Sequence, residues 1–297
     1  MTETTEQPVN EGVANEVSEK TKTKTKTKKR LKKRPLAECY DKYELYQQAV
    51  QEPEADVEFL TRIYRERYGT RPRRLREDFC GTSLLSCEWV KAHPENEAYG
   101  YDIDLEPIEW GMKNNASKLS EGELARLHIH EGNALDVCDP KADVLVGFNF
   151  SYFLFKTRDA LKQYIRAAYE NVAEGGLFAL DIMGGPDAMI EGPEERDCPN
   201  FVYVWDQVKH DPITNGVYTT ISFEFEDGSV IEKAFEYDWR IWTIPEVREL
   251  MEEVGFRETA CYWEGTDPET EEGDGNFSRA DTAETCDCWI AYIVGYK

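Results

Sequence analysis

Residues 75–90 constrain the fold of this 297-residue chain more than any other segment. They read as a short strand that ends in acidic residues, a tight turn at Cys80-Gly81-Thr82-Ser83, and apolar residues at helical spacing. This order forms a ligand cradle, because N–H groups in the turn and in the first helical turn have no partner within the helix. Gly81 has no Cβ, so a ligand can approach the backbone there. The same pattern also suits an ordinary strand-to-helix connection.

Asp102 adds a second feature of such a site. It lies in a strand-like segment, residues 98–104, and follows Gly81 by 21 positions. An acid about 20 residues after the glycine turn is where a doubly wound sheet contacts the hydroxyls of a ribose. With these residues the chain resembles the class I S-adenosylmethionine-dependent methyltransferase superfamily, whose first motif is an acid followed by a glycine-rich turn. The resemblance places Glu77 at the acid, and Phe79 and Ser83 at two glycine positions of the motif.

The resemblance implies that S-adenosyl-L-methionine is the cofactor and that the reaction transfers its methyl group. In such a site Glu77 holds the methionyl amino group and Asp102 binds the ribose hydroxyls. The turn between them consists of Cys80, Gly81 and Thr82. Methyl transfer is an in-line displacement, so the protein mainly has to position the nucleophile and exclude water.

Asn133 and Ala134 are the residues that the resemblance places against the adenine ring. They follow the strand-like residues 127–131, where the superfamily carries a Gly-Asp-Ala turn. Asn133 stands at the aspartate position, and its side-chain carbonyl can still accept a hydrogen bond from the adenine amino group. The alternative is a structural turn residue, since asparagine tolerates unusual backbone angles.

The elements after Asp102 predict an α/β fold with a doubly wound, mainly parallel sheet, which is the Rossmann-like methyltransferase fold. Strand-like and helical patterns alternate along this part of the chain, and such alternation is characteristic of parallel sheets. Residues 142–148 are apolar almost throughout, as expected for a central strand that is buried on both faces. The other expected elements are helices at 105–118 and 157–172 and strands at 127–131 and 177–182.

An antiparallel β insertion, from about residue 190 to residue 243, is predicted to cap the site. Short turns and the absence of helical spacing in this region favour an antiparallel meander. Its expected strands are residues 201–210, 217–225 and 230–242.

The C-terminal part of the chain is expected to complete the main sheet. A helix is predicted at 244–254, and strands are predicted at 256–263 and 286–296. The intervening residues 264–284 are rich in acids, so they are expected to form a solvated loop.

The ordered domain is expected to span residues 35–297. Its first part, residues 35–69, predicts two helices, and helices at this place often cover the donor pocket in the superfamily. Tyr40, Tyr43 and Tyr46 are therefore candidates for a lid. The alternative for each tyrosine is ordinary packing against the sheet.

Residues 1–34 are expected to form a disordered basic tail. Residues 20–34 hold ten basic residues and no acid, although the whole chain has a net charge of −24. The rest of the chain is therefore strongly acidic and would repel a phosphate backbone. The tail could contact nucleic acid or an anionic membrane, and the alternative is a solvated leader without a partner.

The composition suits a soluble protein of the cytoplasm, or of the nucleus if the host is eukaryotic. No apolar run approaches the ~18 residues that span a bilayer, and no apolar signal segment follows Met1. The eight cysteines and four histidines show no metal-ligand spacing. We therefore expect reduced thiols and no metal site.

Candidates for the acceptor side follow the fourth strand or belong to the cap. Asn149 and Tyr152 lie just beyond residues 142–148, where open α/β sheets bind ligands, and Asn149 is also expected beside the donor. Arg240 stands among aromatic residues of the cap and could bind a carboxylate with two hydrogen bonds. An acidic domain with an aromatic cap favours a small-molecule acceptor, namely an amine or a zwitterion.

Two other functions stay open from the sequence. The enzyme could methylate a macromolecule or a lipid that the basic tail recruits, in which case the cap is a docking surface. Alternatively, the chain could be a non-catalytic scaffold that binds S-adenosylmethionine with the same fold. Donor binding and the size of the methylated product distinguish these functions from the small-molecule one.

Overall fold

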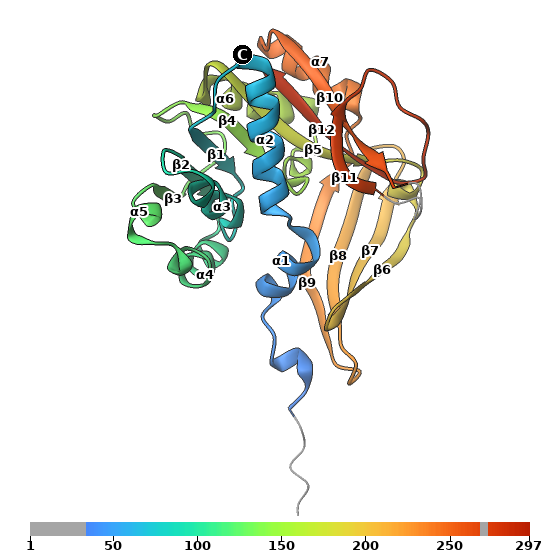
Figure 1. The fold of residues 1–297 in the computed structure, drawn as a ribbon. Helices are drawn as coiled ribbons and strands as arrows, with labels where there is room; N and C mark the ends of the chain where they lie inside the picture. The colour runs from blue at the N-terminus through green and yellow to red at the C-terminus, as the bar shows by residue number, and fades with distance from the viewer. Residues whose placement is uncertain (1–33, 268–272) are drawn as a thin grey trace, which may run out of the picture. The chain divides into compact units, whose positions relative to one another are not determined.

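An eight-stranded sheet, in the order β11-β10-β12-β5-β4-β1-β2-β3, forms the centre of the fold (Figure 1). The computed structural model describes residues 34–267 and 273–297, so the predicted basic tail lies outside the described residues except for Arg34. Neighbouring strands from β1 to β5 run parallel, and β12, β10 and β11 continue the sheet in antiparallel pairing. The doubly wound, mainly parallel sheet is thereby confirmed. The parallel strands are β1 (Arg74–Asp78), β2 (Glu97–Asp102), β3 (Leu127–Glu131), β4 (Ala142–Gly147) and β5 (Val172–Gly184).

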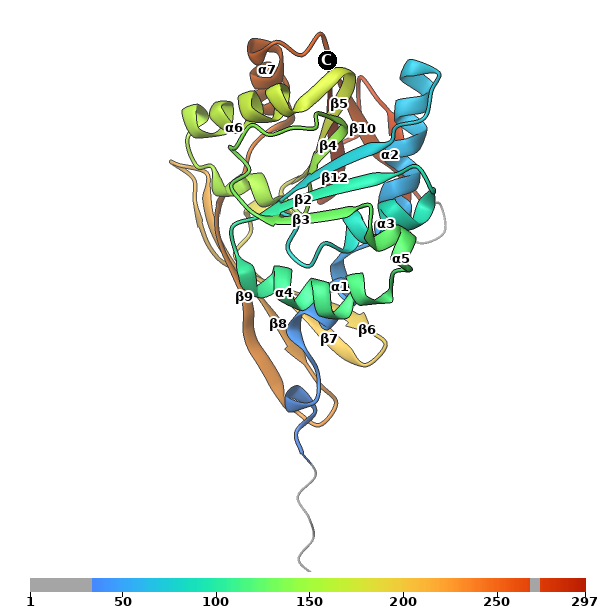
Figure 2. The ribbon, with the colours of Figure 1, turned by 90° about the vertical axis from the view of Figure 1, so that its left-hand side faces the viewer.

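Helices cover both faces of this sheet (Figure 2). Val144 and Val146 of β4 belong to the core cluster beneath α2 and α3, whereas Leu145 belongs to the cluster beneath α6 and α7. Successive side chains of a strand point to opposite faces, so an apolar run such as β4 is buried on both sides. Among the described helices, none is long and apolar enough to cross a membrane. The helices are α2 (Pro53–Tyr68), α3 (Leu84–Ala92), α4 (Leu105–Asn114), α5 (Glu121–Leu124), α6 (Arg158–Asn171) and α7 (Ile244–Val254).

A second sheet of four antiparallel strands is inserted between β5 and α7. It has one strand more than the sequence predicts, because β6 was not recognised. The side chains of β6 are mostly polar and exposed, so they carry no alternation of apolar residues. The strand nevertheless pairs along its whole length with β7. These cap strands are β6 (Gly192–Cys198), β7 (Phe201–Asp211), β8 (Gly216–Glu224) and β9 (Val230–Arg240).

Helix α1 (Lys42–Val50) packs on the cap sheet, beside β9 in Figure 1. Its N-cap is Asp41, whose side chain accepts a hydrogen bond from the Tyr43 backbone N at 2.9 Å. Leu45 is fully buried in a cluster with Ile221 and Phe223 of β8. The helix therefore belongs structurally to the cap as much as to the main domain.

The segment expected as a solvated acidic loop, residues 264–284, contains a strand instead. β11 (Gly273–Arg279) pairs antiparallel with β10 (Glu258–Thr266), and Phe277 packs against Phe59 and Tyr292. The prediction was wrong here because only Phe277 of this strand is partly buried and its other side chains are exposed. Residues 268–272 lie outside the described part. The last strand of the sheet is β12 (Trp289–Tyr296).

Candidate active site

The turn after β1 has the backbone shape of a three-glycine turn, although it contains one glycine. Phe79, Gly81 and Ser83 have φ angles of 58°, 49° and 57°, which all lie in the left-handed region. They are the three positions that align with the glycines of the superfamily motif. This conformation costs a residue with a side chain about 1–2 kcal/mol. The Phe79 ring, packed against Phe155 and Tyr164, helps to hold it.

The turn is closed on one side and open on the other. A Cβ at Gly111 of α4 would lie 2.2 Å from the Thr82 carbonyl oxygen, so only glycine lets the helix pack this closely. In front of Gly81, no atom of the described chain outside residues 80–82 lies within 4 Å of the position that a Cβ would take. The Cys80 side chain is buried, and its backbone N donates to the Tyr101 carbonyl at 3.1 Å. Burial raises the pKa of the Cys80 thiol, so this residue contributes shape and not a reactive group.

Glu77 is a buried carboxylate at the end of β1. Its Oε2 accepts hydrogen bonds from the Ser86 backbone N at 3.0 Å and from Ser86 Oγ. Burial raises the pKa of Glu77 to about 8, and no Lys or Arg of residues 34–267 and 273–297 forms an ion pair with it. A cationic ligand group would favour the ionised form. The site is therefore chemically suited to the amino group that the sequence assigns to Glu77.

Asp102 lies beside the glycine turn because β2 is the neighbour of β1. Its Oδ2 accepts a hydrogen bond from the Gly81 backbone N at 2.8 Å, and its Oδ1 accepts one from the Asp104 backbone N at 2.9 Å. Each carboxylate oxygen has a further lone pair for a ligand hydroxyl. Burial raises the pKa of Asp102, and these backbone donors partly oppose that rise.

The turn after β3 places Asn133 and Ala134 at the same sheet edge. The Asn133 side chain is exposed, and its Oδ1 accepts a hydrogen bond from the Leu135 backbone N at 2.9 Å. This contact stabilises the turn. A carbonyl oxygen has two lone pairs, so Oδ1 can still accept a hydrogen bond from an adenine amino group, and that contact stays a prediction. Ala134 is buried. Sequence reasoning missed Ile103 and Leu135. Both are apolar, yet their side chains are 72% and 37% exposed, so they offer apolar surface on which an adenine ring could pack.

A cavity of about 280 Å³ lies between the ends of β4 and β5, the cap sheet and α1. Aromatic side chains dominate its wall, and three charged residues, Asp181, Glu194 and Arg196, also line it. Asn149, expected on both the donor and the acceptor side, belongs to this lining. The aromatic lining residues are Tyr46, Phe150, Tyr203, Trp205, Tyr237 and Trp239.

Asp181 is a charged residue of this cavity that sequence reasoning did not select, as are Glu194 and Arg196. Its two oxygens accept hydrogen bonds from the backbone N atoms of Asn149, at 2.7 Å, and Phe150, at 3.0 Å. Burial raises the pKa of Asp181 to about 7, and the negative charge of Asp56 contributes to the rise. The sequence did contain a signal for this residue, namely an acid within the apolar run 177–182. Burial of a charged group is costly, so an acid in a buried strand suggests a functional role.

Tyr152 and Arg240, the other predicted catalytic residues, do not line the cavity. Tyr152 is fully buried in the core cluster beneath α6. The Arg240 guanidinium pairs with Glu246 at 2.8 Å and stacks on Trp242 at 3.7 Å, so it joins β9 to the start of α7. Successive side chains of a strand point to opposite faces, so Arg240 points away from the cavity that Trp239 lines.

Helix α1 lies between the glycine turn and the cavity. Gln47 Nε2 donates a hydrogen bond to Thr82 Oγ1 at 2.7 Å, and the Tyr43 hydroxyl donates one to Glu106 at 2.9 Å. Tyr46 lines the cavity from the same helix. Of the three lid candidates, Tyr46 is the one that lines the cavity, whereas Tyr43 contacts Glu106 of α4 and Tyr40 stacks on Phe225 of the cap at 5.2 Å.

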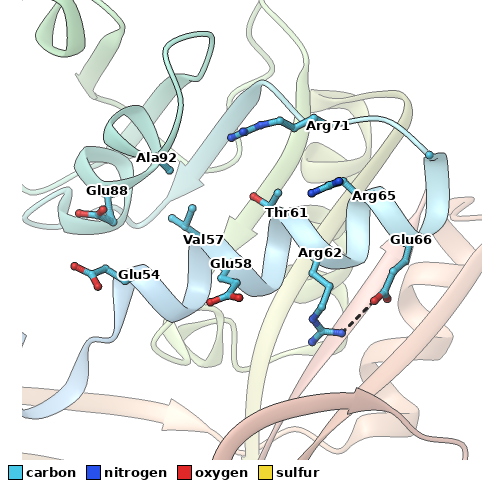
Figure 3. A pocket seen from close by; sticks show the side chains of 11 residues that line it. Glu54, Val57, Glu58, Thr61, Arg62, Arg65, Glu66, Arg71, Glu88 and Ala92 are labelled. Atoms are coloured by element: carbon cyan, nitrogen blue, oxygen red, sulfur yellow. Dashed lines mark ion pairs between the residues drawn. The ribbon is translucent and has the colours of Figure 1, made fainter.

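A larger hollow of about 870 Å³ lies between α2, the loop that follows it and α3 (Figure 3). Charged side chains of both signs line it, and Arg62 pairs there with Glu66 at 3.5 Å. The loop that carries Arg71 enters β1, so this hollow lies at the amino end of that strand. Ligands of open α/β sheets bind at the carboxyl ends. The smaller cavity is therefore the candidate acceptor site.

No family model and no curated protein matches this chain. Solved structures do match it. An S-adenosylmethionine-dependent methyltransferase from Clostridium acetobutylicum is 17% identical with a TM-score of 0.62, covering 86% of this chain and 98% of that protein. A sugar N-methyltransferase from Streptoalloteichus is 15% identical with a TM-score of 0.57, covering 86% and 92%.

A third match is an amino pentose methyltransferase from Micromonospora echinaspora, 14% identical with a TM-score of 0.57, covering 85% of this chain and 97% of that protein. Similarity at this level of identity shows the fold alone. The chain thus has the fold of S-adenosylmethionine-dependent methyltransferases over most of its length.

Proposed function

We propose that this protein is an S-adenosylmethionine-dependent methyltransferase that methylates the nitrogen of a small amine or zwitterion. The observation that carries the proposal is Asp181, a buried carboxylate in an aromatic cavity. No Lys or Arg in the described part of the chain forms an ion pair with it. Aromatic faces and a carboxylate together attract an ammonium group, at about 0.5–2 kcal/mol for a cation on a ring.

The residues around the glycine turn support the choice of donor. Glu77 is suited to the amino group of the methionyl part, Gly81 to close approach of the ligand, and Asp102 to the ribose hydroxyls. Ile103 and Leu135 offer exposed apolar surface to the adenine ring. When bound, S-adenosylmethionine supplies a methyl group on a positively charged sulfur.

The acceptor nitrogen has to lose a proton before its lone pair can attack the methyl carbon. Asp181 is the candidate for taking that proton, because it lines the cavity and burial raises its pKa to about 7, a value that suits a general base at neutral pH. With the donor bound, the nitrogen would gain the methyl group, and the electrons of the broken C–S bond would stay on sulfur as a neutral thioether. A carboxylate on a zwitterionic acceptor would meet Arg196, which lines the cavity, in preference to Arg240.

Two further observations support a small acceptor. A volume of about 280 Å³ is near the lower limit of small-molecule pockets, roughly 300 to 1,000 Å³. In addition, two structural neighbours are described as a sugar N-methyltransferase and an amino pentose methyltransferase.

Incubation with labelled donor and a cell extract, followed by separation of the products by size, tests the proposal. We expect the label in the small-molecule fraction. Label confined to protein, nucleic acid or lipid would favour recruitment of a large acceptor by the tail. Failure of the purified protein to bind S-adenosylmethionine or S-adenosylhomocysteine would contradict the methyltransferase activity itself, and failure to transfer a methyl group despite binding would favour the scaffold.

The role of Asp181 is tested with the acceptor found in that way. Asp181→Asn should lower kcat/KM by about 100-fold, because a proton acceptor typically contributes that much. The matched control is Asp197→Asn, which changes an exposed acid of β6 and should have no effect. A wild-type rate for Asp181→Asn would exclude this residue as the base.

A further inference from the structure

Arg76 is a buried arginine in the middle of β1, only 3% exposed. Its Nε donates a hydrogen bond at 2.8 Å to Oδ1 of Asp78, which is fully buried. Burial of such a pair has a large desolvation cost, so the pair is weak support for a purely stabilising role. The guanidinium also makes contacts outside β1.

The same guanidinium reaches the turn that follows β3. Arg76 Nη2 donates to the Asp136 carbonyl oxygen at 3.1 Å and, at 3.4 Å, to the carbonyl oxygen of Ala134. Its plane lies over the Tyr101 ring, 4.3 Å from the centroid. One side chain therefore contacts the three segments that carry the predicted donor residues, namely the end of β1, the end of β2 and the turn after β3.

We infer that Arg76 is a positioning residue. It fixes the 133–136 turn relative to the glycine turn, so that Asn133 Oδ1 can accept a hydrogen bond from the adenine amino group. This inference rests on the proposed function. The planar guanidinium can bind Asp78 and both carbonyl groups at once, because its five N–H donors have a fixed arrangement. A lysine ammonium is a point charge and does not reproduce that arrangement.

The test uses calorimetry with two ligands that differ at one edge of the purine, because replacing the 6-amino group by an oxygen also places a proton on N1. S-adenosylhomocysteine carries the adenine amino group, and S-inosylhomocysteine has an oxygen in its place. The wild type should prefer the adenine form by about tenfold, near the upper end of what one hydrogen bond contributes. Arg76→Lys should bring the ratio of the two dissociation constants to within about twofold.

Two further variants separate positioning from stability. Arg76→Met combined with Asp78→Leu removes both members of the buried pair and leaves neither charge unpaired, so the protein should fold, and it should also lose the discrimination. Arg126→Lys is the matched control, because Arg126 binds the carbonyl oxygens of Val90 and His93 near the amino end of β3. This control should lose stability and keep the ratio.

Two results would overturn the inference. Binding of both ligands with an unchanged ratio in the Arg76 variants would exclude the positioning role and leave the proposed function intact. Absence of binding of either ligand to the wild type would instead contradict the donor site, and the inference with it.

Discussion

Single residues decide how the glycine turn and Asp102 form one site. The pattern of an acid, a turn and a second acid 21 residues after Gly81 identified the residues that meet here. The sequence could not show that Asp102 binds the Gly81 backbone N, since that contact depends on the register of β1 and β2. Nor could it show that Phe79 and Ser83 adopt the backbone conformation of glycine.

Asp102→Ala should weaken binding of S-adenosylhomocysteine by ~2 kcal/mol or more, about 30-fold, because charged hydrogen bonds to the ribose are lost. Isothermal calorimetry measures the effect. The control is Asp104→Ala, which removes the N-cap of α4 and should lower the melting temperature without changing the affinity. Equal affinity of the Asp102 variant and the wild type would place the ribose elsewhere.

At the scale of elements, α1 connects the donor side to the cap. The helix packs its apolar face on β8 and donates from Gln47 to Thr82 in the glycine turn. A movement of the cap would therefore carry a residue of the donor site with it. Sequence periodicity predicted this helix, but a helical pattern does not reveal which of two sheets it covers.

Gln47→Ala should increase the dissociation rate of S-adenosylhomocysteine severalfold, since it removes one contact between the helix and the turn, a hydrogen bond of about 1 kcal/mol. Stopped-flow displacement measures this rate. Gln48→Ala changes the adjacent, exposed glutamine and should leave the rate as it is. If both variants dissociate like the wild type, α1 does not retain the donor.

The strands that escaped prediction have a common physical reason. β6 and β11 lie at the edges of their sheets and expose most of their side chains, so backbone pairing forms them without an apolar pattern. Strand β4 and residues 177–182 of β5 were predictable because strands that are buried on both faces are apolar almost throughout. The positions of Arg240 and Tyr152 also could not be predicted from sequence. The Arg240 side chain points away from the cavity because side chains alternate along β9, and Tyr152 is buried in the core beneath α6.

At the scale of the whole molecule, buried carboxylates make stability depend on pH. Burial raises the pKa of Glu77 to about 8, of Asp181 to about 7 and of Asp56 to about 6. The folded protein therefore holds protons that the unfolded chain has already released above about pH 4. The free energy of unfolding should fall as pH rises from about 4 to 8 and then level off.

Urea unfolding of the ligand-free protein at pH 5.5 and pH 8 measures this dependence. Replacing Glu77 by Gln should reduce the difference between the two pH values by on the order of 1–3 kcal/mol, because one titrating group is removed. A greater stability at pH 8 than at pH 5.5 would show that these carboxylates are ionised in the folded protein.

Every described residue of the candidate cavity lies between positions 46 and 290, outside the lysine-rich residues 20–34. Deletion of residues 1–34 should leave the affinity for S-adenosylhomocysteine and the turnover of a small acceptor unchanged. Any binding of the full chain to anionic vesicles or nucleic acid should weaken as salt rises, because such contacts are electrostatic. Loss of small-acceptor turnover on deletion would assign the tail a catalytic role.

The turn of Phe79, Gly81 and Ser83 also bears on the entropy of ligand binding. A loop of three glycines is free to sample many conformations and loses that freedom when a ligand orders it. In this chain two of the three positions carry side chains, and the partly buried Phe79 ring packs against the core. The ordering therefore takes place during folding, so the loop meets its ligand in a preorganised state and binding should carry a smaller conformational penalty.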